Sequence, residues 1–312
     1  MSAITTAITP SAPPVTDSGV LLEPSPSSAT PPTDPGGRTR RRLARVQPGL
    51  VLAWLVVAVV VAWAIAPGLF TGFNPVSGTP RERLLPPGVE HWLGTDELGR
   101  DLYARIVYGA VHSLLGAFLA VTVGFFVGNL LGLVAGSVGG FVDAVVGRIV
   151  DVLLSIPGLL LSLSIIILLG FGTVNAAIAV GVTSVAAFAR LSRSEVLRVR
   201  RSDYVEAAFG SGGRFWSVLV RHVLPNSLGP VLAFTALQFG SAIIAISTLG
   251  FLGYGAPPPT PEWGLLIAEG RNYIATSWWI TTFPGIVVII IVLAANRISQ
   301  SAGRRSGGRK TS

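Results

Sequence analysis

Long apolar runs separated by short polar stretches dominate the pattern of hydrophobic and polar positions along this chain. A helix that crosses the hydrocarbon core of a bilayer needs roughly 20 mainly apolar residues. We expect Pro157 to kink one of these runs, because proline removes a backbone N–H donor inside a helix. The pattern predicts an all-α, polytopic membrane protein with six transmembrane helices, at residues 50–70, 111–138, 149–171, 174–188, 228–251 and 278–295.

The segments outside these runs have a different composition. Residues 1–37 are rich in proline, serine, threonine and glycine and show no apolar periodicity, which is typical of disorder. We therefore expect a disordered tail over residues 1–46 and a short basic tail over residues 301–312. The first apolar run is long and follows a late basic cluster, so we expect it to be retained as a span rather than cleaved as a signal peptide.

Positive charge is distributed unequally between the two sides of the membrane. Six spans place both termini on one side, and the segments on that side hold 18 of the 23 lysines and arginines. Because basic residues accumulate in cytoplasmic loops, both termini and the loop over residues 190–225 are expected in the cytoplasm. The net charge of +8 is explained by this topology without nucleic acid as a partner.

Composition excludes several kinds of chemistry. Only 12% of the residues are charged, whereas soluble domains usually carry about 25%. The chain has no cysteine, and its three histidines show no metal-motif spacing. It also lacks the GxxxxGK[ST] phosphate loop. We expect no catalytic residue, no metal and no cofactor bound by this chain.

The cytoplasmic segment over residues 193–226 is predicted to form two short helices. Ser202 is the expected N-cap of the first helix, with Asp203 and Glu206 in its first turn. Glycines over residues 210–213 would end it, and a second apolar helix would run over residues 214–223, before Pro225. The plainer interpretation is an ordinary basic loop.

Within this segment, Glu206-Ala207-Ala208, Gly212 and Leu224-Pro225 resemble the EAA motif of ABC importer permeases. The resemblance implies that the first helix is a coupling helix, which docks in a groove on an ATPase subunit. His222 stands where the family usually has an apolar residue. The ending basic-His-apolar-Leu-Pro-Asn, which residues 221–226 match, is however common in the peptide-transporter branch of the family. The residues expected to couple to the ATPase are Tyr204, Glu206, Ala207, Ala208, Gly212, Leu224 and Pro225.

The predicted external loop contains the string HWLGTDELGRD over residues 91–101. No nucleophile or metal-ligand spacing lies nearby, so we expect a capped turn with buried ion pairs: Thr95 or Asp96 as the N-cap, and Arg100 with Asp101 holding the segment. The string is similar to the signature of the second permease subunit in dipeptide, oligopeptide and nickel importers. Its signature residues are Gly94, Thr95, Asp96, Gly99, Arg100 and Asp101.

Two further stretches resemble the same family. One contains Asp143, Arg148 and Asp151, and we expect the last two to pair because residues three apart share a helix face. These charges either anchor the membrane edge or act at a permease interface. The other stretch, residues 251–264, is expected to form a rigid proline-rich turn with Trp263 at the membrane interface.

The resemblance covers residues 48–300 and implies the transmembrane domain of a type I ABC importer. We expect residues 47–110 to form the first transmembrane helix and external loop, and residues 111–300 to form the importer transmembrane domain, with the cytoplasmic coupling loop over residues 193–226. Implied partners are a homologous second permease, two cytoplasmic ATPases that bind ATP and magnesium, an extracytoplasmic peptide-binding protein and membrane lipid. The expected location is the bacterial cytoplasmic membrane.

The cargo stays open within this family, among dipeptides, oligopeptides, glutathione and nickel. An ion-coupled secondary transporter and a membrane-embedded enzyme are the alternatives from other classes. Both need ionisable residues at membrane depth, and the centres of the predicted spans hold almost none.

Overall fold

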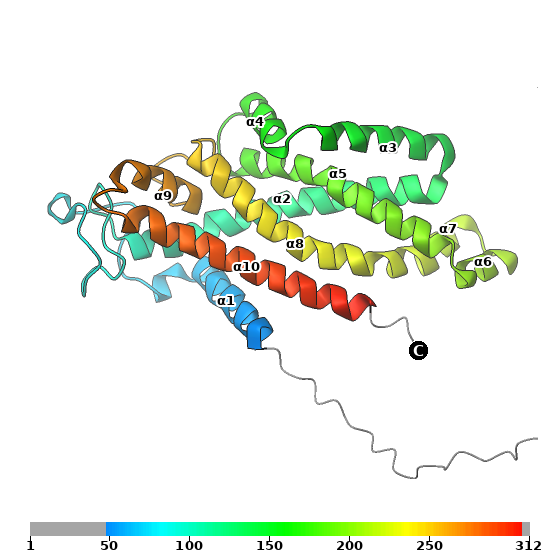
Figure 1. Cartoon of the computed structure of the whole chain (residues 1–312), viewed down its shortest axis with the longest axis horizontal. Coiled ribbons are helices and arrows are strands. Elements are labelled where there is room, and N and C mark those ends of the chain that lie inside the picture. The colour runs from blue at the N-terminus through cyan, green and yellow to red at the C-terminus, as the bar shows by residue number, and fades with distance from the viewer. Residues whose placement is uncertain (1–47, 308–312) are drawn as a thin grey trace, which may run out of the picture. The chain divides into compact units, whose positions relative to one another are not determined.

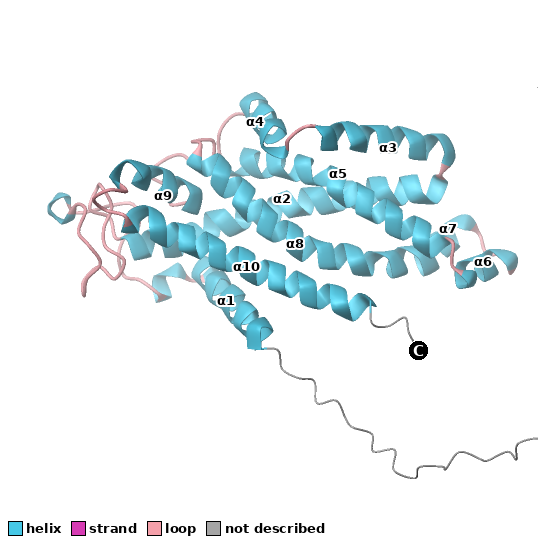
Figure 2. Ribbon diagram, viewed as in Figure 1, coloured by secondary structure: helices cyan, strands magenta, loops and turns pink. Residues whose placement is uncertain are grey.

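Helices account for most of residues 48–307, the part of the chain that the computed structural model describes (Figures 1 and 2). No strand occurs in this range, which has one isolated bridge between Thr95 and Asp101. The predicted disordered tail over residues 1–46 lies outside the described residues, as do residues 308–312 of the basic tail. The α-helices are α1 Pro48–Ile65, α2 Leu102–Val138, α3 Gly140–Ser155, α4 Gly158–Leu169, α5 Thr173–Arg200, α6 Asp203–Gly210, α7 Phe215–Val218, α8 Leu224–Phe251, α9 Trp263–Gly270 and α10 Trp279–Gly307.

Five continuous helices and one bent pair correspond to the six predicted spans. The continuous ones are α1, α2, α5, the helix from Phe215 to Phe251, and α10. The third predicted span is not a kinked single helix, because α3 and α4 meet at 95°. Ile156, which precedes Pro157, has extended backbone angles, as expected where the proline ring disfavours the helical region. The kink predicted at Pro157 is thus a complete break.

The helices reach well beyond the apolar runs that predicted them. α2 starts at Leu102 rather than at residue 111, and α5 continues through its arginines to Arg200. With 37 residues, α2 is about 55 Å long at 1.5 Å per residue, whereas a hydrocarbon core is about 30 Å thick. Hydropathy marks only the part of a helix inside the apolar layer. Arginine and glutamate are good helix formers, so the helix continues past that layer.

A line of small residues lets α2 and α5 pack closely. Every fourth residue of α2 from Gly124 to Gly136 is glycine. A Cβ atom at Gly128 would lie 2.5 Å from the carbonyl oxygen of Val185 and 2.6 Å from Cβ of Phe188. Such spacing of small residues is a common basis for tight packing between membrane helices. The α2–α5 pair therefore forms the centre of the fold, with Phe188 fully buried against it.

α8, α9 and α10 complete the core on one side of this pair, and α1 lies outside it. Side chains of α2, α8, α9 and α10 share one buried cluster. α1 buries only Ala53 and Val60, so most of its surface faces away from the protein. Figure 1 shows α6 and α7 at one end of the helices and the long loop before α2, with α9, at the other. The two stretches richest in polar candidates thus lie at opposite ends.

Candidate functional site

α6 presents one free face and one packed face. Tyr204, Glu206 and Ala207 are exposed, whereas Val205 is fully buried and Ala208 is half-buried. The buried side chains belong to a separate hydrophobic cluster that joins α5, α6, α7 and the π-helical turn before α8. Its buried members are Val196, Val199, Val205, Val218, Leu219 and Val223. A short helix of eight residues is marginal alone, and this cluster holds it in place while leaving Glu206 and its neighbours accessible.

The ends of α6 are formed by backbone geometry rather than by a side-chain cap. Ser202 occupies the N-cap position but makes no capping bond, because its hydroxyl donates to the carbonyl of Val199. The predicted N-cap position of Ser202 is therefore confirmed, with Asp203 and Glu206 in the first turn, but the capping hydrogen bond of its side chain is not formed. At the other end, Gly212 has φ +85 and its N–H donates to the carbonyl of Phe209 at 3.0 Å. Only glycine adopts this left-handed conformation without strain, so Gly212 sets the turn that follows α6.

The second predicted helix does not stop before Pro225. α7 passes through a π-helical turn, Leu219–Val223, directly into α8, which makes one continuous helix from Phe215 to Phe251. Pro225 lies in the first turn of α8, next to the wider π-helical turn that accommodates its ring. Leu224 and Pro225 therefore belong to the spanning helix.

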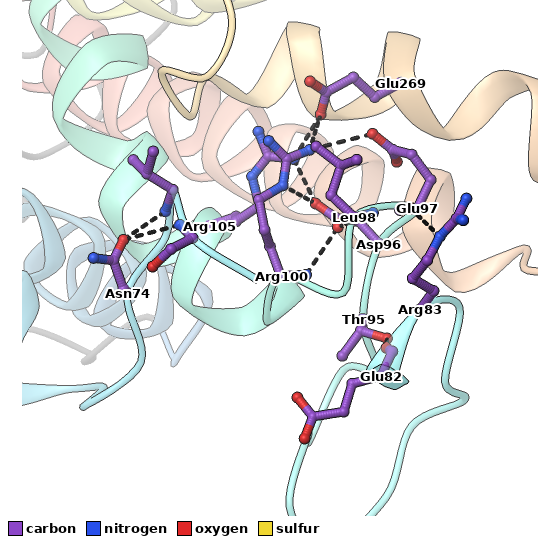
Figure 3. A network of polar contacts seen from close by, with 12 residues as sticks. Asn74, Glu82, Arg83, Thr95, Asp96, Glu97, Leu98, Arg100, Arg105 and Glu269 are labelled. Carbon is purple, nitrogen blue, oxygen red and sulfur yellow. Dashed lines mark hydrogen bonds and ion pairs between the residues drawn. The ribbon is translucent and has the colours of Figure 1, made fainter. Parts of the chain in front are cut away.

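An ion-pair cluster occupies the opposite end of the molecule (Figure 3). Asp96 accepts from Arg100 Nε at 2.6 Å and from Arg105 Nη1 at 2.7 Å. Arg105 Nη1 also donates to Glu269 of α9 at 2.6 Å, and Arg100 Nη2 donates to Glu97 at 3.2 Å. Both arginines are almost completely buried. The cluster therefore fixes the loop and the start of α2 against α9.

The turn over residues 91–101 is capped and contains buried ion pairs, as predicted, but the roles of its residues differ. Asp101, not Thr95 or Asp96, is the N-cap of α2: it accepts from the N–H of Ala104 at 2.7 Å. Its other oxygen lies 2.8 Å from His91 Nδ1. Arg100 pairs with Asp96 rather than acting with Asp101.

Glycines make the close approaches in this loop. Gly94 and Gly99 have φ +78 and +73, a conformation that favours glycine. A Cβ at Gly99 would lie 2.0 Å from the carbonyl oxygen of Thr79. Thr95 is buried, and its hydroxyl accepts from the N–H of Leu85 at 2.8 Å. Gly94, Thr95 and Gly99 thus shape the loop and support the cluster.

Three carboxylates in the cluster are near enough to one another to hold a cation. These are Asp96, Glu97 and Glu269, whose oxygens lie within 4.8 Å of one another. Each already faces Arg100 or Arg105, which supply the positive charge that a metal would supply. Burial, with a smaller contribution from Asp96 and Glu269, raises the pKa of Glu97. The donor set is that of a structural ion-pair network.

Sequence reasoning missed Glu262, which precedes α9. Its side chain is fully buried, Oε2 accepts from the N–H of Ala256 at 2.8 Å, and Oε1 has no partner among the described residues. Burial raises the pKa of Glu262 to about 7. A sequence gives no direct signal of burial, although an acid between proline and tryptophan at a helix start is a weak hint.

Trp263 is not at a membrane interface as predicted. It is 0% exposed, its indole N–H donates to the carbonyl of Ile106 at 3.0 Å, and its backbone N–H donates to Ser113 Oγ at 3.2 Å. The tryptophan therefore fixes the start of α9 against α2 inside the core.

α3 and α5 are joined by two ion pairs. Asp143 accepts from both Arg193 Nε and Arg193 Nη2, the latter at 2.7 Å, and Asp151 accepts from Arg190 at 2.8 Å. The predicted pair between Arg148 and Asp151 is wrong, because Asp151 faces α5 and pairs with Arg190 there. Arg148 lines the same surface pocket as these four residues. The acidic residues hold α3 along α5.

Five apolar helices and one bent pair are long enough to cross a membrane, so the described part of the chain has the architecture of a multi-pass membrane protein. The family model for the inner membrane component of binding-protein-dependent transport systems matches residues 128–306. This chain belongs to that family, which makes it a permease subunit and a multi-pass inner membrane protein.

Curated relatives cover most of the chain. A dipeptide transport system permease protein, DppC, from Alkalihalophilus pseudofirmus is 37% identical over 89% of this chain and 93% of its own length. A probable D,D-dipeptide transport system permease protein, DdpC, from Escherichia coli is 38% identical over 78% and 82%. A glutathione transport system permease protein, GsiD, from Salmonella paratyphi A is 37% identical over 82% and 83%.

The fold is also present in a solved structure. A chain of the MetNI methionine ABC transporter, in an inward-facing conformation, matches with a TM-score of 0.51 and 20% sequence identity. The match covers 64% of this chain and 96% of that chain. The protein therefore has the fold of an ABC importer transmembrane subunit.

Proposed function

We propose that this chain is the second permease subunit of an ATP-driven importer that moves peptides across the bacterial cytoplasmic membrane. Two relatives named for dipeptide transport, at 37 and 38% identity, support peptides as the cargo. The relative named for glutathione transport fits the same class, because glutathione is itself a small peptide. The expected boundary at residue 110 falls inside α2, so the first helix and its external loop end at residue 101 and the importer domain begins with α2.

The observation that carries this proposal is the free face of α6. Tyr204, Glu206 and Ala207 stand exposed on a helix held from behind by the valine cluster. A small residue such as Ala207 lets a helix enter a groove closely, and Glu206 can accept charge-assisted hydrogen bonds from the partner. We assign this face to the ATPase subunit. Since the chain lacks a phosphate loop, ATP and magnesium bind to two such partner subunits.

The remaining partners follow from the family. A binding-protein-dependent system implies an extracytoplasmic binding protein, here one for peptides, and a homologous second permease. The distribution of 18 of 23 basic residues places α6 and both termini in the cytoplasm. The ion-pair cluster then lies on the outer side, where it keeps the loop before α2 rigid for a docked binding protein.

The geometry supports a simple route for coupling. When the ATPase pair closes on ATP, it displaces α6, and α6 is packed on α5, α7 and the π-helical turn before α8. Because α7 continues into α8 without interruption, the displacement reaches the spans as a rigid-body movement. The spans then alternate between access from outside and access from the cytoplasm.

The class of transporter is tested by reconstituting the chain with its second permease, ATPases and binding protein in liposomes. We expect uptake of a labelled dipeptide that requires ATP and the binding protein. Uptake driven by an ion gradient without ATP would contradict the proposal and favour a secondary transporter.

The role of α6 is tested by reversing one exposed charge. We expect Glu206→Lys to abolish uptake while the complex still assembles. The lysine would repel the positively charged hydrogen-bond donors of the ATPase subunit. Gln300→Lys, at an exposed position on α10, is the control and should transport normally. Normal uptake by Glu206→Lys would show that Glu206 is not part of the surface that contacts the ATPase subunit.

A further inference from the structure

The pair α3–α4 is interrupted by an exposed irregular segment. Ile156 and Pro157, the residues between the two helices, both have extended backbone angles, and the helix axes differ by 95°. Every side chain over residues 154–160 is exposed on this chain. A Cβ at Gly158 would meet no atom within 4 Å. Residues 155–158 are called the break below.

The break lies inside the apolar layer. Asp151 and Arg190, which pair at 2.8 Å and are 65 and 61% exposed, mark the polar edge where α3 runs beside α5. Beyond this pair, residues 152–172 and 173–189 contain no charged side chain. At 1.5 Å per residue, Ser155 lies about 6 Å beyond Asp151 toward the apolar side. The helix therefore stops at a depth where other spans are continuous.

The backbone at the break cannot be satisfied by lipid. The first bond of α4 runs from the N–H of Leu161 to the carbonyl of Pro157 at 3.1 Å. The N–H groups of residues 158–160 have no partner within the helix, and no side chain caps its start. Hydrocarbon offers no acceptor for them. Irregular backbone at membrane depth is tolerated only when it is buried in protein or lines a water-filled cavity.

The described part of this chain does not bury the break, so lipid, water or another subunit is left to face it. A dry apolar surface on another subunit leaves the same N–H groups unpaired, whereas water pairs with all of them. We propose that residues 155–158 line the water-filled part of the translocation pathway, on the face that this permease turns toward the second permease. The proposal rests on the importer function given above and names the segment of the chain that cargo passes.

The chain contains no cysteine, so single introduced cysteines report the environment of chosen positions. Ser155→Cys and Ile156→Cys probe the break. Leu55→Cys, on α1 and 57% exposed, is the control for a lipid-facing position, and Val89→Cys, 95% exposed in the external loop, is the control for full access to water. The assembled transporter in open membrane fragments is treated with a charged, membrane-impermeant methanethiosulfonate. A background without introduced cysteines corrects for the partner subunits.

Only the thiolate reacts, and a thiol forms thiolate only where water reaches it, so we expect both break cysteines to react at least about tenfold faster than Leu55→Cys. Reaction of both break positions as slow as that of Leu55→Cys would overturn the proposal and indicate contact with lipid or a dry subunit interface. ATP-driven uptake by the transporter without introduced cysteines is measured in parallel. Loss of that uptake contradicts the importer function, whereas normal uptake with unreactive break cysteines contradicts this inference alone.

Discussion

The buried carboxyl of Glu262 predicts a pH-dependent stability that one substitution should remove. Glu262 is 0% exposed, and a Cβ at Gly250 or Gly255 would lie 2.8 or 2.4 Å from its carboxylate oxygens, so little room remains for water. Within residues 48–307, Oε2 has a hydrogen-bond partner, the N–H of Ala256, and Oε1 has none. We consider Glu262→Gln, which has nearly the same shape and cannot ionise.

The pKa of Glu262 is raised from 4.5 to about 7 because burial disfavours the charged form. A folded-state pKa above the unfolded value means that the folded protein holds a proton that the unfolded chain has released. Stability is therefore highest below pH 4.5, falls as the pH rises to about 7, and changes no further above that value. At about 1.4 kcal/mol per pKa unit, the total loss is ~3 kcal/mol.

Thermal unfolding of the purified complex in detergent, followed between about pH 5 and pH 8, measures this dependence. We expect the wild-type protein to lose stability across that range and Glu262→Gln to keep it, so that their difference grows as the pH rises. Glu90→Gln, which changes an exposed glutamate on the same side of the protein, is the control and should follow the wild type. Parallel curves for the wild type and Glu262→Gln would refute the reasoning.

Three further substitutions test the packing, the ion-pair cluster and the turn after α6. Gly128→Ala should destabilise the protein by roughly 1–3 kcal/mol through overpacking of α2 on α5; Gly147→Ala, whose Cβ meets no atom within 4 Å, should be neutral or slightly stabilising in the same unfolding assay. Arg105→Met leaves Asp96 without one buried partner and should cost about 3–5 kcal/mol, seen as low yield of folded protein, whereas the exposed Arg83→Met should behave as wild type. Gly212→Ala must adopt φ +85, which should lower the free energy of unfolding by about 1 kcal/mol or reduce coupled transport. A transport activity and an unfolding temperature equal to those of Gly147→Ala would show that position 212 does not require glycine.

The apolar runs and the family motifs predicted the helices and their number well, but not where the helices end. Hydropathy reports the solvent around a helix, and α5 continues past Arg190 because its backbone bonds do not depend on the solvent. The second helix was expected to end before Pro225. The π-helical turn before Pro225 leaves room for the proline ring, so the helix continues into α8. The break at Pro157 is larger than the expected kink because the extended backbone of Ile156, before the proline, interrupts the helix completely.

The polar residues of the external turn were found correctly, but their partners were not. Asp101 caps α2 because its second oxygen is held by His91, ten residues earlier. Arg105 is paired with Glu269, 164 residues away, and such contacts depend on tertiary structure. Burial of Glu262 likewise depends on the packing of the whole molecule, so its raised pKa does not follow from the local sequence.

The central claim, that α6 is the helix on which an ATPase subunit docks, is tested most directly by crosslinking from Ala207. A cysteine at this exposed position, in a chain that otherwise has none, is coupled to a short photoreactive group in the assembled transporter. We predict a crosslink to the ATPase subunit that is absent when the group is placed at position 89 of the external loop. A crosslink from position 207 to the binding protein, or to no subunit of a complex active in ATP-driven uptake, would contradict the account.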